Sequence, residues 1–472
     1  MARLVSLVLA AALAGGGVYA LSSSPILAQN APSAPVPDIT ASSAPERFAQ
    51  WLDAEAARAM EAGARARREL SSADQVKERA EAARRIVLDA MGGLPETRTP
   101  LNARITGGFE REGYRVEHLV FESLPGLFVT ATVYVPTGRP GPFPAVLGTA
   151  GHSDDGKAAP IYQHAWISFA RRGMIVLAYD PPAQGERLED LDPATGKPRV
   201  GSGTQAHSHA GQQCLLTGTS IARYFAWDGV RALDYLLTRS DVDPSRIAVA
   251  GNSGGGTQAT WLAAVEPRLA AVVSSCYITS WPELWKGPGP QDMEQVLPGF
   301  LAHGLDFADA ILAAAPRPYL VSSAIRDFFP IAGARDTVAQ TRRLYLLLGA
   351  AERLHQVETD ATHGWSQPLR EGAYEWFGRW GLAAAGSGAS EGTVTVEPVE
   401  HLRATPTGQI ETSFGTRTIF DYNLDRAREL TRTRTPVTRD RLRQFLGIPS
   451  TLPAPAVVRR EPDDGNADLR TE

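Results

Sequence analysis

Short apolar runs alternate with segments of helical periodicity through the middle of the chain. The runs with the length and β-branched content of strands are residues 114–122, 126–135, 143–148, 174–179, 247–251, 270–275, 317–323 and 353–359. Helical spacing of apolar residues marks residues 162–172 and 221–238. Strands that alternate with helices predict an α/β protein with a mostly parallel, doubly wound sheet and helices on both faces.

A helical prefix precedes these strands. Residues 45–91 have helical periodicity, and Ser72 with Gln75 has the spacing of a capping box that begins a second helix. Gly92 and Gly93 are typical of its end. We therefore assign residues 45–112 to a helical N-terminal prefix and residues 113–385 to the main domain.

The pattern weakens after Ala385. Residues 386–392 have the composition of a Gly/Ser linker, and residues 393–446 contain few apolar positions. Residues 453–472 have the composition of a disordered tail. We expect residues 386–472 to form a linker and a poorly structured C-terminal extension.

The first residues have the pattern of an export signal. Arg3 precedes an apolar stretch over residues 4–14, and small residues ending at Ala20 or Ala28 are suitable cleavage sites. The alternative is an uncleaved anchor helix, which the glycines at 15–17 disfavour because they interrupt a run that is short for a membrane span. We expect a signal peptide over residues 1–28, a disordered linker over 29–44, and a periplasmic or secreted protein that leaves the membrane after cleavage.

Composition narrows the range of partners. The 472 residues include 47 Lys and Arg against 52 Asp and Glu, a net charge of −5. This balance disfavours a nucleic-acid partner, which would favour a basic stripe. Cys214 and Cys276 are the 2 cysteines, and the sequence leaves open whether they pair or remain as buried thiols.

The strongest chemical signal is G-x-S-x-G, centred on Ser253 between a predicted strand and a predicted helix. This context is typical of the nucleophile elbow of α/β-hydrolases and predicts a serine hydrolase. The rival interpretation is a dinucleotide-binding loop, because residues 254–259 also fit G-x-G-x-x-A. That loop requires an acidic residue at the end of the next strand, where this chain has Cys276.

A serine nucleophile needs a base and an orienting acid, which in this fold follow it in the order acid, then histidine. His363 lies just past the last predicted strand, and Asp327 follows the strand before it. The backbone amides of Gly254 and of His152, in the loop after residues 143–148, are the expected oxyanion donors. No metal or cofactor is expected.

Several stretches together resemble the acetylxylan esterase and cephalosporin-C deacetylase kind of α/β-hydrolase, especially bacterial exported relatives, over residues 114–381. They are GHSDDGKA (151–158), YDPPAQGERLE (179–189), CLLTGTSIARYFAWDGVRALDYLLTR (214–239), VAGNSGGGTQA (249–259), RDFFPIAGAR (326–335) and THGWSQPLRE (362–371). The resemblance implies the same triad and oxyanion donors, and an exported esterase that removes short acyl groups, acetyl above all, from an oligosaccharide or small-molecule ester. The chain departs from many hydrolases at residues 150–152, where Ala-Gly-His replaces His-Gly-x.

Two further features have alternative interpretations. Trp281 and Trp285 follow a strand where a cap over the site often begins, and they either stack on sugar rings or simply pack. His207 and His209 have no acidic residue close in sequence, which favours an ordinary loop over a metal site.

Alternative functions on the same fold are a peptidase related to prolyl oligopeptidases and a binding module without activity. The first usually carries a large β-propeller, for which residues 45–110 are too few and too helical. An intact triad disfavours the second. The sequence leaves the oligomeric state open.

Overall fold

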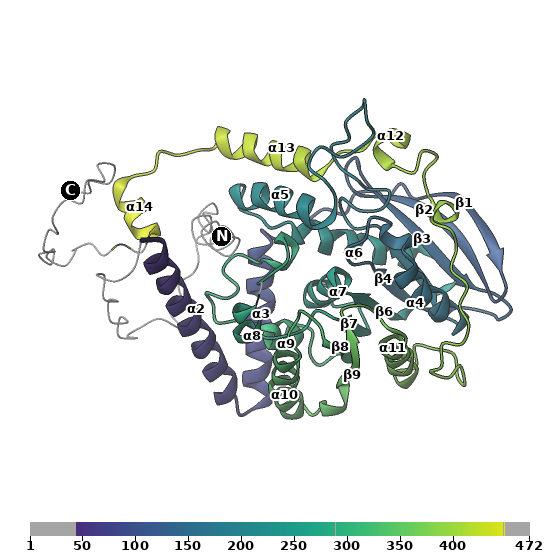
Figure 1. Ribbon diagram of the computed structural model, residues 1–472, viewed down its shortest axis with the longest axis horizontal. Helices are drawn as coiled ribbons and strands as arrows, with labels where there is room; N and C mark the ends of the chain where they lie inside the picture. Colours follow the sequence, from purple (N-terminus) through teal and green to yellow (C-terminus); the bar gives the residue numbers. More distant parts are fainter. Residues whose placement is uncertain (1–43, 288, 447, 449–472) are drawn as a thin grey trace, which may run out of the picture. The chain divides into compact units, whose positions relative to one another are not determined.

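A nine-stranded sheet is the centre of the structure (Figure 1). The structure is a computed structural model that describes residues 44–287, 289–446 and 448, so the predicted signal peptide and the tail over 453–472 lie outside the described residues. The strand order is β1-β2-β3-β5-β4-β6-β7-β8-β9. The strands are β1 (Arg104–Arg111), β2 (Tyr114–Leu124), β3 (Leu127–Pro136), β4 (Phe143–Thr149), β5 (Ile175–Tyr179), β6 (Val242–Asn252), β7 (Ala271–Ser275), β8 (Tyr319–Arg326) and β9 (Leu354–Thr362).

The expected sheet is confirmed. Six strands, which are neighbours in the order β5-β4-β6-β7-β8-β9, pair in parallel. The pairings β1–β2, β2–β3 and β3–β5 are antiparallel. Each of the eight predicted runs lies within one observed strand or extends it by one or two residues. The carboxyl ends of the parallel strands therefore meet at one edge, where sites of α/β proteins form.

Both faces of the sheet are covered because side chains alternate along each strand. On β6, Ile247 and Val249 belong to a core shared with helices α6 (Ala222–Thr238), α7 (Gly254–Val265), α9 (Phe307–Leu312) and α10 (Ile331–Leu347). Ala248 and Ala250 face the opposite core, which holds helices α4 (Pro160–Arg171) and α11 (Gln367–Arg379). This arrangement is the expected doubly wound sheet.

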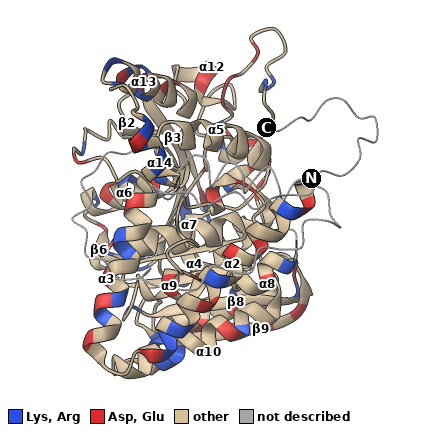
Figure 2. Ribbon diagram, turned by 90° about the vertical axis from the view of Figure 1, so that its left-hand side faces the viewer, with Lys and Arg blue, Asp and Glu red and all other residues tan. Residues whose placement is uncertain are grey.

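The prefix consists of helices α2 (Ala44–Glu69) and α3 (Ala73–Ala90). The capping box of Ser72 and Gln75 is present at the start of α3, and Gly92 and Gly93 follow its end in the left-handed conformation. Both signs of charge are interspersed along α3 (Figure 2), and its buried side packs against α7 and α9. The described part of the prefix contains no β-propeller.

One strand lies within the assigned prefix. Residues 104–111, assigned to the helical prefix, form β1, which pairs with β2. Almost all of its side chains are exposed, so the strand carries no apolar alternation. It is held by the backbone ladder with β2 and by polar contacts such as the pair of Arg111 with Glu397. An interpretation that depends on apolar periodicity could not detect it.

The expectation of a poorly structured extension is wrong for residues 391–419, which we call the C-terminal segment. This segment belongs to the same compact unit as the sheet, a unit that runs to Arg428. Helix α12 (Ile410–Phe414) lies in the segment, and α13 (Ile419–Arg432) begins at its end. The second unit, residues 429–472, contains the end of α13 and helix α14 (Arg439–Phe445).

Buried polar groups and buried apolar groups both hold the C-terminal segment. Leu402 belongs to the core beside α4 and α11, and Ala404 and Ile410 pack against Val120. The Glu186 carboxylate accepts hydrogen bonds from the amides of Ala404 (2.7 Å) and Thr405 (2.8 Å). The same carboxylate pairs with the buried ammonium of Lys157 at 2.7 Å, and Lys157 also pairs with Asp180 at 2.7 Å. The segment is therefore fixed by charge-assisted contacts to groups within the main domain.

No helix in the described residues is long and apolar enough to cross a membrane. Cys214 and Cys276 are both free and buried. Cys214 donates to Asn423 and Cys276 to the carbonyl of Gly364, so the two thiols occupy different surroundings.

A pH dependence of stability follows from Glu189, which is 7% exposed and accepts a hydrogen bond from the amide of Ile419 at 3.1 Å. Burial raises the pKa of Glu189 from 4.5 to about 7. Between these values the folded chain holds a proton that the unfolded chain has released, so stability falls as pH rises through this window.

We predict that Glu189→Gln removes this loss. Relative to the wild type, the variant should gain on the order of 2–3 kcal/mol in free energy of unfolding between pH 5 and pH 8. Urea unfolding at both pH values measures the gain. Glu375→Gln, which removes an exposed carboxylate of α11, is the control. Its free energy of unfolding should change between the two pH values as that of the wild type does. The same change in free energy of unfolding in Glu189→Gln and in the wild type would contradict the prediction.

Candidate functional site

Ser253 lies in the sharp turn between β6 and α7, with φ 61° and ψ −126°. A residue other than glycine rarely adopts this conformation, and where it does the surroundings must hold it. The amide of Ser253 donates to the carbonyl of Ser275 at the end of β7 (2.9 Å), and its carbonyl accepts from the amide of Thr257 (3.0 Å). The neighbouring strand and the first turn of α7 thus fix the serine.

Two glycines around Ser253 are required by close approach. A Cβ on Gly251 would lie 2.2 Å from Oγ1 of Thr149, and a Cβ on Gly255 would lie 2.0 Å from the carbonyl oxygen of Thr149. Both distances are far below a van der Waals contact. The G-x-S-x-G pattern therefore reflects the narrow space between the turn and the end of β4.

The structure brings Ser253, Asp327 and His363 together in one hydrogen-bonded chain. The Oγ atom of Ser253 lies 2.8 Å from Nε2 of His363, and Nδ1 of His363 lies 2.9 Å from Oδ1 of Asp327. Asp327 follows β8 and His363 follows β9, as expected from their places in the sequence. With Nδ1 protonated toward the carboxylate, Nε2 is free to accept the proton of the serine hydroxyl.

The three residues differ in exposure. The side chain of Asp327 is 2% exposed, whereas that of His363 is 25% exposed. The ring of Phe328 lies 4.3 Å from the ring of His363 and is 36% exposed, so it forms an outer wall beside the imidazole. Cys276 is a near neighbour, but burial raises the pKa of its thiol to about 12, which keeps it protonated at neutral pH.

The loop after β4 lies against the first turn of α7. A Cβ built on Gly151 would lie 3.0 Å from the amide nitrogen of Gly254, and one on Gly254 would lie 3.0 Å from Cε1 of His152. Among the hydrogen bonds described, neither the Gly254 amide nor the His152 amide is a donor. Both expected oxyanion donors thus lie close to Ser253 with their N–H groups available.

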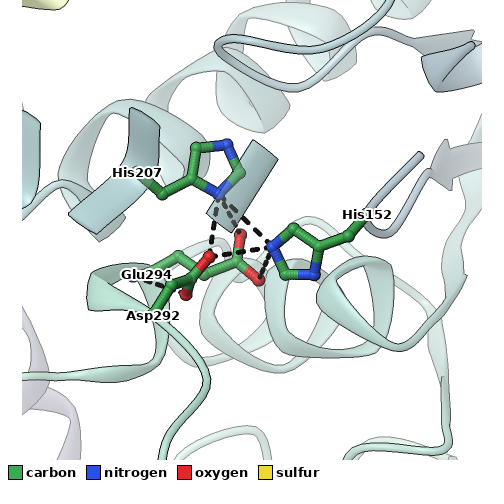
Figure 3. Close-up of side chains that lie close together, drawn as sticks. All are labelled: His152, His207, Asp292 and Glu294. Atoms are coloured by element: carbon green, nitrogen blue, oxygen red, sulfur yellow. Dashed lines mark hydrogen bonds and ion pairs between the residues drawn. The ribbon is translucent and has the colours of Figure 1, made fainter. Parts of the chain in front are cut away.

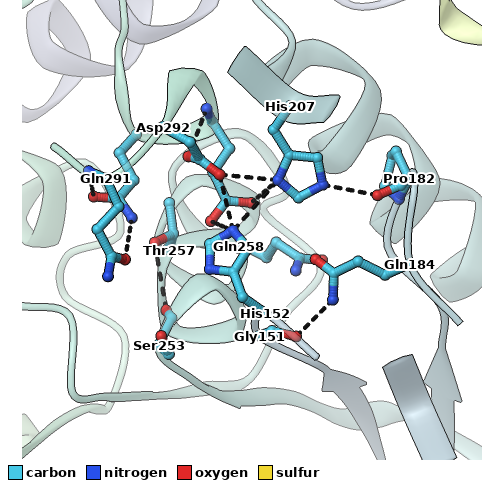
Figure 4. A network of polar contacts seen from close by, with 12 residues as sticks. Gly151, His152, Pro182, Gln184, His207, Ser253, Thr257, Gln258, Gln291 and Asp292 are labelled. Carbon is cyan, nitrogen blue, oxygen red and sulfur yellow. Dashed lines mark hydrogen bonds and ion pairs between the residues drawn. The ribbon is translucent and has the colours of Figure 1, made fainter. Parts of the chain in front are cut away.

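Side-chain amides hold the carbonyls of this loop. Gln184 donates to the carbonyl of Gly151 at 2.8 Å (Figure 4). Gln258 donates to the carbonyl of Ala150 at 2.7 Å. Gln184 belongs to YDPPAQGERLE, which therefore supports the loop after β4. These contacts fix the orientation of the peptide units that precede His152.

A second polar cluster, whose three segments lie far apart in the sequence, adjoins this loop (Figure 3). It contains His152, His207 from α5 (Gly203–Leu216), and Asp292 and Glu294 around the short 3-10 helix η2 (Met293–Gln295). Burial alone would lower the pKa of His152, but Glu294 and Asp292 outweigh it and raise the pKa. His207 lies on a helix, not in a loop, and its acidic neighbour Asp292 is 85 residues away in the sequence.

The tryptophans proposed for substrate binding contact other parts of the structure. Trp281 begins helix α8 (Trp281–Lys286), lies 5.9 Å from the ring of Phe307 and donates its amide to Asp306. Trp285 donates its indole N–H to Asp53 of α2 at 2.9 Å. The contacts described for both rings are those of packing between α8, α9 and the prefix.

One polar cavity lies away from Ser253. Its volume is about 130 Å³, and its lining includes Asp154, Lys157, Glu186, Arg403 and Gln409. None of the three hydrogen-bonded residues lines it. The cavity therefore belongs to the contact between the main domain and the C-terminal segment.

The chain is similar to known hydrolases and esterases. Residues 100–286 match the family described as acetyl xylan esterase (AXE1). A Bacillus subtilis (strain 168) protein named as a hydrolase, YtaP, is 29% identical over 311 residues, which are 61% of this chain and 96% of that protein. The carbohydrate esterase MZ0003, from an unknown prokaryotic organism, is 29% identical over 161 residues, but these are only 35% of its length and 29% of this chain.

Among solved structures, the methylesterase BT1017 superposes with a TM-score of 0.63 at 21% identity. The superposition covers 80% of this chain and 81% of that one. It supports the α/β-hydrolase fold across most of the described residues.

We predict that the turn does not tolerate Gly255→Ala. The added Cβ meets backbone, not a flexible side chain, so the free energy of unfolding should fall by more than about 3 kcal/mol. Urea unfolding and soluble yield measure the loss. Gly378→Ala is the control, because that glycine lies in α11 with nothing within 4 Å of an added Cβ. It should be neutral or stabilising by up to about 1 kcal/mol. Equal stability of the two variants would show that the turn has more space than described.

Proposed function

Because the chain is a carboxylic ester hydrolase that resembles the acetyl xylan esterases, we propose that Ser253 is its nucleophile, His363 its general base and Asp327 the residue that orients the base. The observation that carries the proposal is the hydrogen-bonded chain from Ser253 through His363 to Asp327, with distances of 2.8 and 2.9 Å. A serine hydroxyl is a weak nucleophile unless a base removes its proton as it attacks. His363 is that base in the proposal, and its Nε2 lies within hydrogen-bond reach of the serine hydroxyl.

In the first step Oγ of Ser253 attacks the ester carbonyl carbon while Nε2 of His363 takes the hydroxyl proton. The carbonyl π bond breaks, and its electron pair remains on the oxygen as an anion. The carboxylate of Asp327 stabilises the imidazolium that forms, because it already accepts the Nδ1 proton. The tetrahedral carbon then expels the alcohol, which takes the proton from Nε2, and leaves an acyl-serine.

The amides of Gly254 and His152 stabilise the anion of this intermediate. Gly254 is the first residue of α7, so its N–H lies at the positive end of the helix dipole. Preorganised donors of this kind contribute about 3–4 kcal/mol each to transition-state stabilisation. Water, activated by His363, then attacks the acyl-serine, releases the acid and restores the hydroxyl.

The proposed substrate is an acetyl ester of a carbohydrate. The family matched over residues 100–286 and the carbohydrate esterase among the relatives support this substrate class. The partly exposed His363 lets a bulky alcohol group remain outside the buried part of the site while the small acyl group reaches Ser253.

Export is part of the same proposal. Arg3, the apolar residues 4–14 and the small residues before Ala20 and Ala28 support it. A polysaccharide substrate would be met outside the cytoplasm.

We predict that Ser253→Ala lowers kcat on an aryl acetate and on acetylated xylooligosaccharides by about 10⁴-fold or more. Acetate release measures the rate, and labelling by a fluorophosphonate reports the reactive serine directly. Ser245→Ala, which removes an exposed hydroxyl, is the control and should retain wild-type rates.

Each outcome of this experiment is decisive for one part of the proposal. Hydrolysis of the aryl acetate alone would reject the carbohydrate acetate but retain the serine esterase. Methanol release from a methyl-esterified uronic acid oligosaccharide, without acetate release, would show that the sugar supplies the acid part of the ester and not the alcohol part. Equal rates of Ser253→Ala and the wild type would reject the nucleophile, and an unlabelled wild type would favour a binding module.

We also predict that the full chain expressed in a bacterium accumulates outside the cytoplasm with a new N-terminus after Ala20 or Ala28. Intact-mass measurement of the fractionated protein tests this, and a variant lacking residues 2–28 should remain in the cytoplasm. An unprocessed chain in the membrane fraction would indicate an anchor instead.

A further inference from the structure

Four side chains from three separate segments direct their polar atoms at one point beside the site (Figure 3). Nε2 of His152 and Nδ1 of His207 lie 2.8 and 2.9 Å from the same oxygen, Oδ2 of Asp292, and 3.3 Å from each other. The oxygens of Glu294 lie 3.5 Å from the His152 nitrogen and 3.9 Å from the His207 nitrogen. Except for His152, the group is fully buried.

The tautomer of His207 follows from its other nitrogen. Nε2 lies 2.8 Å from the carbonyl oxygen of Pro182, which can only accept, so Nε2 carries a proton (Figure 4). In a neutral imidazole Nδ1 then presents a lone pair toward Asp292. A lone pair 2.9 Å from a carboxylate oxygen is repulsive unless a cation lies between them.

His152 adds a second nitrogen to the same point. A proton on each ring would require His207 to be an imidazolium, because its Nε2 already donates to Pro182. It would also direct two N–H groups at one carboxylate oxygen with the nitrogens only 3.3 Å apart in a buried site, which is unfavourable. Glu294 is a second, independent sign. Its side chain is 2% exposed, and its Oε1 accepts no hydrogen bond from the residues that the structure describes.

We propose that His152, His207, Asp292 and Glu294 bind one divalent transition-metal ion of the zinc type. Ligands about 2.0–2.2 Å from a tetrahedral zinc ion lie roughly 3.3–3.6 Å apart. The two histidine nitrogens are 3.3 Å apart, and the Glu294 oxygens lie 3.5 and 3.9 Å from them. Oδ2 of Asp292, at 2.8 and 2.9 Å from the same nitrogens, would move outward by about half an ångström to admit the ion. Two imidazoles with two carboxylates suit zinc, whereas magnesium and calcium prefer oxygen ligands alone.

The remaining contacts of the cluster are those of ligand-orienting groups. A metal-bound histidine usually donates its other N–H to a carbonyl or carboxylate, as Nε2 of His207 does to Pro182. Asp292 accepts the amide of Glu294 through Oδ1, which leaves Oδ2 for the ion. The ion would join the loop after β4, helix α5 and the segment of η2.

The proposed ion site adjoins the start of α7. A Cβ built on Gly254 would lie 2.7 Å from Oε1 of Glu294. A bound cation would therefore fix His152, whose amide we assign to the oxyanion hole, and would place positive charge near that hole. This link to catalysis rests on the proposed function, whereas the binding site does not.

Calorimetry tests the proposal. The mature wild-type protein is first stripped of metal with a chelator and shown by circular dichroism to be folded. It should then bind one zinc ion per chain, and it should bind neither magnesium nor calcium at the same concentration. Asp292→Asn and His207→Gln should weaken zinc binding by at least about 100-fold. His209→Ala, two residues along α5 and exposed, is the matched control and should bind as the wild type does.

A second measurement keeps the test valid if these variants do not fold. Cobalt bound to the stripped wild type should show the intense visible bands of a tetrahedral site, and equimolar zinc should abolish them. A folded wild type that binds neither zinc nor cobalt overturns the proposal, as does equal zinc affinity in Asp292→Asn or His207→Gln. Zinc binding without Ser253-dependent hydrolysis would reject the esterase mechanism and retain the metal site.

Discussion

The left-handed backbone at Ser253 is the constraint on which the arrangement of the site depends. It is possible because the end of β4, the end of β7 and the first turn of α7 surround the serine closely enough to hold φ at 61°. The hydroxyl of Thr149 donates to the carbonyl of Gly255 at 2.7 Å, so the strand next to the serine also fixes the helix that follows it. The register of the parallel strands thus determines where Oγ, the imidazole and the two candidate oxyanion amides lie.

Support for the loop after β4 comes from several distant parts of the chain. Gln184 and Gln258 hold its first carbonyls, and Lys157 at its end is neutralised by Asp180 and Glu186. Burial would raise the pKa of Glu186, but the charge of Lys157 outweighs this effect and lowers the pKa. Removing one partner of such a buried pair typically costs about 3–5 kcal/mol. The loop that carries His152 is therefore coupled to the same buried charges that hold the C-terminal segment.

The sheet and the three aligned residues were predictable because their signals are local. Alternation marks the strands, and Asp327 and His363 each directly follow one, so their order along the chain was enough to bring them together. Helix α5 was not predicted because its buried side consists mainly of small and polar residues, which give only a weak apolar stripe. The cluster with Asp292 was missed because its members are joined only by the tertiary fold. The C-terminal segment was misjudged since backbone amides bound to buried carboxylates leave no trace in hydropathy.

The contact between Glu186 and the amides of Ala404 and Thr405 has a consequence for the order of folding. Residue 186 precedes residue 404 by more than two hundred residues, so it leaves the ribosome, or the membrane channel of an exported chain, well before the C-terminal segment does, and chains fold from the N-terminal side first. Until the C-terminal segment arrives, the carboxylate of Glu186 has Lys157 but lacks these backbone donors, and water must take their place. The loop beside Ser253 consequently gains the last of its described hydrogen-bonded support only when nearly the whole chain has emerged, so the completed site forms late in folding.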